Sequence, residues 1–145
     1  MTNTTYRTDF YAWTQEQVAL LAAEEWEKLD IANIKEEIDS LGKRDKKEVA
    51  SRLKVLLMHL LKWKYQPQMN TGPSWHSTIR TQREEIEDEL EYSPSLRREV
   101  PALIAKAYPR ARRDAADETS LALTTFPTDC PWTVEEILDE DWLPG

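Results

Sequence analysis

The sequence predicts an all-α fold: an up-and-down bundle of five to six helices with a short C-terminal helix and a wrapped tail. Apolar residues recur every three or four positions over most of the 145 residues, as they do along helices that bury one face. Only three residues are glycine, whereas a fold rich in tight turns needs many. No stretch alternates apolar and polar residues as a half-buried strand does. We therefore expect one helical domain over residues 1–145, with an N-terminal arm at 1–13 and a docked acidic tail at 126–145.

Side chains that suit the start of a helix occur at regular intervals along the chain. Each can accept a hydrogen bond from the free N–H groups of a first helical turn. In order they are Thr14, Asp30, Asp45, Ser74, Ser93 and Thr133. We expect the second helix to stop at Gly42 and the third to end near Tyr65, before a loop at 67–73. Pro101 and Pro109 are expected to kink or split the fifth helix, with two pieces that meet near Pro109, because each proline removes an N–H and crowds the preceding turn.

The third helix carries the widest apolar face. The side chains on this face are Val49, Leu53, Leu56, Leu57, Leu60 and Leu61. The strip that we expect to face solvent is narrow and holds Ser51, Lys54, Met58 and Lys62. A helix with so narrow a polar strip packs on several sides, so we place it at the centre of the bundle.

Charge is unevenly distributed along the chain, whose formal net charge is −8. Residues 1–42 hold three basic and nine acidic side chains, residues 43–113 hold 16 and nine, and residues 114–145 hold none and nine. The basic middle segment 43–113 either binds an anionic partner such as nucleic acid or is neutralised by acidic ends that fold back over it. We favour the second interpretation, because nucleic-acid-binding domains usually carry a basic balance overall.

Three observations bear on the cellular compartment. Cys130 is the only cysteine, which excludes an intrachain disulfide and favours a reducing environment. The opening segment MTNTTYRTDFYAW lacks the basic and apolar regions of a secretory signal. The longest apolar run, 55–61, is too short to cross a bilayer. We expect a cytoplasmic protein that has no membrane partner.

A candidate ligand or partner cluster lies on the third and fourth helices. Its members are His59, Trp63, Trp75, Gln82 and Arg83. Gln82 falls within an apolar stripe, where an unpaired polar group costs about 1–3 kcal/mol. The cluster is therefore either a small-molecule or partner site, or a satisfied polar network that aligns the two helices. We favour the network.

No catalytic residue, metal site or cofactor is predicted. The two histidines, His59 and His76, lie on different helices, and neither completes the Glu-x-x-His pair of helical di-metal sites. Cys130 has no basic neighbour in sequence that would lower the pKa of its thiol. An enzyme whose site is assembled in space near His59 stays an alternative. A second alternative is that the protein binds a single nucleic-acid strand, whose bases stack on the aromatic side chains that flank the loop at 67–73.

Several long motifs occur in a fixed order. They are DFYAW, NIKEEIDSLGKRDKKEV, LLMHLLKWKYQPQ, SWHSTIRTQREEIEDELEYSPSL and FPTDCPWTVEEILDEDWLP. Together, over residues 6–144, they resemble the bacterial domain-of-unknown-function family number twenty-nine (DUF29). The resemblance implies a compact helical fold in a bacterial cytoplasm and no established activity.

The favoured function is that of a cytoplasmic helical protein-interaction or regulatory module. Its expected partner is another protein or a second copy of the chain. The lack of catalytic motifs and the acidic, aromatic-rich tail favour this interpretation. Nucleic-acid binding through 43–113 and an enzyme near His59 are the alternatives.

Overall fold

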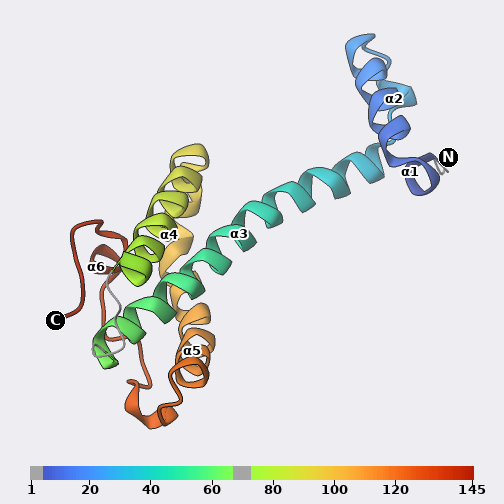
Figure 1. The fold of residues 1–145 in the computed structure, drawn as a ribbon. Helices are drawn as coiled ribbons and strands as arrows, with labels where there is room; N and C mark the ends of the chain where they lie inside the picture. The colour runs from blue at the N-terminus through green and yellow to red at the C-terminus, as the bar shows by residue number, and fades with distance from the viewer. Residues whose placement is uncertain (1–4, 67–72) are drawn as a thin grey trace. The chain divides into compact units, whose positions relative to one another are not determined.

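A computed structural model describes residues 5–66 and 73–145, which form helices and the turns between them (Figure 1). The α-helices are α1 (Thr5–Thr8), α2 (Phe10–Ala22), α3 (Ile31–Tyr65), α4 (Pro73–Tyr92), α5 (Val100–Thr119) and α6 (Val134–Leu138). Shorter 3-10 segments span Trp26–Lys28, Pro94–Glu99 and Leu123–Thr125. The described residues contain no strand, which confirms the all-α class, and α6 confirms the short C-terminal helix. Nearly all of the loop expected at 67–73 lies outside the described residues.

The chain divides into two compact units. We call Met1–Arg44 the amino-terminal unit and Asp45–Gly145 the carboxy-terminal unit. The single domain expected over 1–145 stays a prediction, as do its arm at 1–13 and its docked tail at 126–145.

The first long helix begins at Phe10, inside the expected arm and one turn earlier than the sequence suggests. The Asp9 carboxylate accepts a hydrogen bond from the Ala12 N–H at 3.1 Å and so caps the first turn of α2. The Thr14 hydroxyl donates instead to the Tyr11 carbonyl oxygen, 2.7 Å away. The predicted helix start at Thr14 is therefore wrong, because Asp9 supplies a cap upstream of it.

α3 continues without a break to Tyr65, so the predicted stop at Gly42 and start at Asp45 are wrong. A glycine inside a helix costs only about 1 kcal/mol relative to alanine. Lys43 Nζ lies 2.8 Å from an Asp39 carboxylate oxygen, and this four-residue spacing supports the helix across the glycine. The predicted end at Tyr65 is confirmed.

α3, α4 and α5 enclose the hydrophobic core of the carboxy-terminal unit (Figure 1). The six side chains predicted on the apolar face of α3 are all fully buried, which confirms that face. Elsewhere in this unit, the large apolar side chains in the core are Ile79, Ile86, Leu90, Val100, Leu103, Ile104, Tyr108, Phe126 and Ile137. The tail thus contributes Phe126 and Ile137 to the same core.

The strip of α3 that the sequence assigns to solvent is instead bordered by α5. Lys54 Nζ lies 3.6 Å from an Asp114 carboxylate oxygen, and Lys62 Nζ lies 3.7 Å from one of Glu118. The later residue of α3 pairs with the later residue of α5, so the two helices run in the same direction. Only 8 % of Lys62 is exposed, and its assignment to a solvent-facing strip is wrong. The periodicity of α3 does not reveal that a later helix packs over its polar side.

α5 is one helix from Val100 to Thr119, so the predicted split near Pro109 is wrong. The side chains on either side of the proline, Tyr108 and Ala111, are both buried in the core. Their packing offsets the one backbone hydrogen bond that proline removes.

The tail contains the predicted capping box. The Glu136 N–H donates to Thr133 Oγ1 at 3.1 Å, and the Thr133 N–H donates to Glu136 Oε1 at 3.0 Å. This reciprocal pair begins α6. Trp132 precedes α6 in the sequence and Trp142 follows it. Their rings pack edge to face, with their centroids 5.8 Å apart.

Candidate functional site

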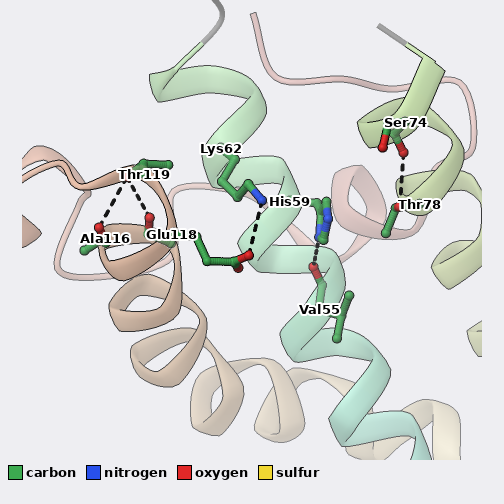
Figure 2. A network of polar contacts seen from close by, with 9 residues as sticks. Val55, His59, Lys62, Ser74, Thr78, Ala116, Glu118 and Thr119 are labelled. Atoms are coloured by element: carbon green, nitrogen blue, oxygen red, sulfur yellow. Dashed lines mark hydrogen bonds and ion pairs between the residues drawn. The ribbon is translucent and has the colours of Figure 1, made fainter. Parts of the chain in front are cut away.

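The predicted cluster begins with His59 on α3. Its Nδ1 lies 2.9 Å from the carbonyl oxygen of Val55, one turn earlier, so the ring donates this hydrogen bond within its own helix (Figure 2). Burial lowers the pKa of the His59 imidazole below its usual 6.5. The lowered pKa favours the neutral form of the ring. This arrangement satisfies the histidine and does not by itself build an acid–base pair.

Lys62, one turn after His59 on α3, is also buried (Figure 2). Its Nζ lies 3.7 Å from Glu118 on α5 and 4.8 Å from the ring centroid of Trp75 on α4. A buried ammonium needs such partners, because desolvation without them costs several kcal/mol. The aromatic face of Trp75 supplies a cation–π contact. Lys62 thus links α3 to both neighbouring helices.

Trp63 lies near the start of α4, with its ring centroid 6.1 Å from that of His76. A cavity of about 280 Å³ lies next to this pair, between α4 and the tail. Its lining residues are His76, Arg80, Glu140, Asp141 and Leu143. Because basic and acidic side chains face the same space, the cavity does not favour ions of one sign.

Arg83 holds the tail against α4. Its side chain is 3 % exposed and donates to the carbonyl oxygens of Ile137 at 2.8 Å, Trp142 at 2.8 Å and Glu136 at 3.3 Å. These oxygens lie at and beyond the end of α6, where backbone acceptors lack helical partners. Burial lowers the pKa of the Arg83 guanidinium, and the nearby Asp139 carboxylate raises it. The residue therefore caps α6 from a neighbouring helix.

Gln82 has a different partner again. Its Oε1 accepts a hydrogen bond from Arg52 Nη1 of α3 at 3.4 Å. The five predicted residues therefore contact five different groups. Their contacts join α3 to α4 and α4 to the tail, which is what a satisfied network requires. A role for them in ligand binding stays a prediction.

Basic side chains of the middle segment 43–113 pair with carboxylates of the same segment. These pairs are Lys46–Glu99, Arg52–Glu48 and Arg97–Glu87. Arg83 and Arg112 bind backbone oxygens of the tail rather than its carboxylates. Lys54 and Lys62 pair with Asp114 and Glu118 of the acidic segment that follows, so the basic segment is neutralised partly from within and partly by its acidic neighbour. Such pairing reduces the number of free cations that a nucleic-acid backbone would meet.

The amino-terminal unit has polar internal contacts. The Trp13 Nε1–H donates to an Asp30 carboxylate oxygen at 2.9 Å, and the Asp30 N–H donates to Gln17 Oε1 at 2.9 Å. The Tyr6 hydroxyl donates to the Glu37 carboxylate, and this bond is the main reason that the pKa of Tyr6 is raised. These contacts join α1 and α2 to α3 through polar groups.

Trp13 of this unit is buried, but most of its other large apolar side chains are exposed. Of the ten exposed ones in the described chain, eight lie here: Phe10, Tyr11, Val18, Leu21, Trp26, Ile31, Ile38 and Leu41. On α3, Ile31 is 61 % exposed, Ile38 64 % and Leu41 53 %. Together with the half-buried Ile34 they form what we call the apolar stripe. Sequence periodicity places these four on one face, but no signal in it shows whether the chain itself covers that face.

Comparison with known proteins gives one result. The family model described as "Domain of unknown function DUF29" matches residues 5–143. The chain belongs to the DUF29 family. The match confirms the resemblance seen in the sequence motifs, and it covers nearly all residues of both units. No curated protein and no solved structure matches the chain.

Three observations describe metal-binding groups, the single thiol and the helices in the described part of this DUF29 chain. Among residues 5–66 and 73–145, no three His, Cys, Asp or Glu side chains are grouped as a metal site requires. Burial raises the pKa of the Cys130 thiol, which keeps it protonated and weakly nucleophilic. None of the described helices combines the length and apolar character needed to cross a bilayer.

Proposed function

We propose that this DUF29 protein is a helical protein-interaction or regulatory module of the bacterial cytoplasm, which binds its partner through the amino-terminal unit. The observation that carries the proposal is the outward-facing apolar surface between residues 10 and 41. Burying one large apolar side chain contributes about 1.5–3 kcal/mol. Ile31, Ile34 and Ile38 line one groove, and apolar side chains that gather on one exposed face mark a protein-binding surface.

The position of this surface also supports the proposal. The apolar stripe lies on a regular helix, so its side chains are held at fixed spacing before a partner arrives, which lowers the entropic cost of binding. The surface includes Trp26 and Tyr11, and tryptophan and tyrosine are enriched among the residues that dominate binding energy. Charged side chains at the edge of the stripe, such as Glu36 and Asp39, give the polar rim of a typical interface.

A matched pair of variants tests the proposal. Ile38→Asp places a charge on the apolar stripe at a position that is already 64 % exposed, so the fold is kept. Ser40→Asp adds the same charge to an exposed position two residues further along α3, on the opposite side of the helix. Each protein is used as bait in a lysate of the native host, and captured proteins are identified and then tested in purified form.

We expect at least one purified partner to bind the wild type and Ser40→Asp equally, and to bind Ile38→Asp more than about tenfold more weakly. Equal binding by all three proteins would refute the assignment of the surface. Circular dichroism of the two variants checks that helix content is unchanged.

A further inference from the structure

The geometry of the apolar stripe indicates what kind of segment covers it. Ile31, Ile34, Ile38 and Leu41 are spaced three, four and three residues apart, which is the a and d spacing of a coiled-coil seam. A shallow groove runs along the first three of them, edged by Lys35, Glu36 and Asp39. A seam with this spacing is best covered by another helix that carries the same spacing.

Charge differs between the two ends of the stripe. Just before Ile31 the chain carries Glu24, Glu25, Glu27 and Asp30 against one basic residue, Lys28. Just after Leu41 it carries Lys43 and Arg44. A second copy of this helix laid antiparallel brings the basic end of each copy to the acidic end of the other. Laid parallel, the two copies bring like charges together, which is unfavourable.

The exposed side chains of the stripe also favour a contact between two copies. Ile31, Ile38 and Leu41 are each more than half exposed, and burying one large apolar side chain contributes about 1.5–3 kcal/mol. In a two-fold interface the same patch serves both copies, so a single chain supplies both halves of the contact.

We infer that the apolar stripe docks against the apolar stripe of a second copy of this chain, with the two α3 segments antiparallel. The inference rests on the proposed function, because both assign this surface to a protein. In this pairing Ile31 of one copy faces Leu41 of the other, and Ile34 faces Ile38. The acidic segment 24–30 of each copy lies near Arg44 of the other.

Sedimentation velocity over roughly a hundredfold range of concentration tests the dimer by mass action. We expect the purified wild type and Ser40→Asp to shift from monomer to dimer as concentration rises. Ile38→Asp is expected to need more than about tenfold higher concentration for the same shift. A purified wild type that stays monomeric throughout, or an Ile38→Asp variant that dimerises equally well, would overturn the inference.

Disulfide cross-linking tests the orientation. On a Cys130→Ser background, chains with Ile31→Cys are mixed with chains with Leu41→Cys and oxidised. The antiparallel pairing predicts a cross-link between the two different chains and almost none between two Leu41→Cys chains, whose cysteines lie about 15 Å apart along the helix axis. Cross-linking mainly between identical chains would overturn the antiparallel pairing.

The two proposals fail in different ways. A monomeric wild type whose capture of another purified protein still depends on Ile38 would overturn the second copy as occupant and leave the proposed function standing. A monomeric wild type with no binding that depends on Ile38 would overturn both.

Discussion

The two halves of α3 carry similar apolar faces with opposite surroundings. In the carboxy-terminal unit, Leu53, Leu57 and Leu60 are fully buried by the chain's own helices. In the amino-terminal unit, Ile31 and Ile38 are more than half exposed, while α1 and α2 contact α3 through polar groups. The comparison shows that the chain's own helices bury the apolar face in one half of α3 and leave it exposed in the other. An exposed face of this kind is available to a partner.

The largest effect on stability is expected when one leucine or isoleucine in each half of α3 is replaced with alanine. We expect Leu57→Ala to lower the free energy of unfolding by about 2–5 kcal/mol, because it leaves a cavity in a packed core. In protein dilute enough to be monomeric, Ile38→Ala is expected to change it by less than about 0.5 kcal/mol, as exposed substitutions usually do. Denaturant melts measure both. A loss below about 1 kcal/mol for Leu57→Ala would show that α3 is peripheral to the core.

A smaller effect is expected where the tail joins the carboxy-terminal unit. Arg83→Met removes the donor to three carbonyl oxygens and is expected to cost about 1.5–3 kcal/mol, the range for hydrogen bonds with a charged partner. Limited proteolysis should then cut faster near Phe126. Arg98→Met, at an exposed position in the 3-10 segment that follows α4, is the control and should change neither measurement. Unchanged stability and cleavage in Arg83→Met would show that the tail is held without this residue.

The smallest effect concerns pH. Because burial lowers the pKa of His59, the unfolded chain binds a proton more readily than the folded one. Stability is therefore complete above the ordinary pKa of 6.5 and falls as pH decreases through that value toward the lower folded pKa. We expect His59→Gln to lose less stability than the wild type between about pH 7.5 and 5.5. Lys62 lowers this pKa further and Glu118 raises it.

Thermal melts of the wild type and of His59→Gln across this range measure the difference. If His59→Gln and the wild type lose stability in parallel, the buried imidazole is not the source of the dependence.

Local patterns in the sequence predict much of the fold. Residue spacing identifies the buried face of α3, the end of that helix at Tyr65 and the capping box at Thr133, because each depends on neighbouring residues. The errors at Gly42 and Pro109 arise where packing or good helix-forming neighbours outweigh a local helix breaker. They show that helix-breaking residues predict ends poorly inside long helices.

The candidate site was harder to predict, because its contacts join segments far apart in the chain. Nothing near Arg83 in sequence shows that its partners are carbonyl oxygens more than fifty residues later. Burial of Lys62 likewise depends on Trp75 and Glu118, which come from two other helices. Residue spacing predicts that the four side chains of the apolar stripe share one face of the helix. It does not predict that this face is exposed.

Hydrogen exchange of the full chain at low and high concentration tests most directly whether the apolar stripe is an interface. We predict that amides of residues 35–44 become more protected when concentration rises roughly a hundredfold, because docking covers and rigidifies that part of α3. Amides of residues 53–61, already within a core, are predicted to be strongly protected and unchanged. Protection of residues 35–44 that does not depend on concentration, with or without a change at 53–61, would contradict the antiparallel pairing of two copies.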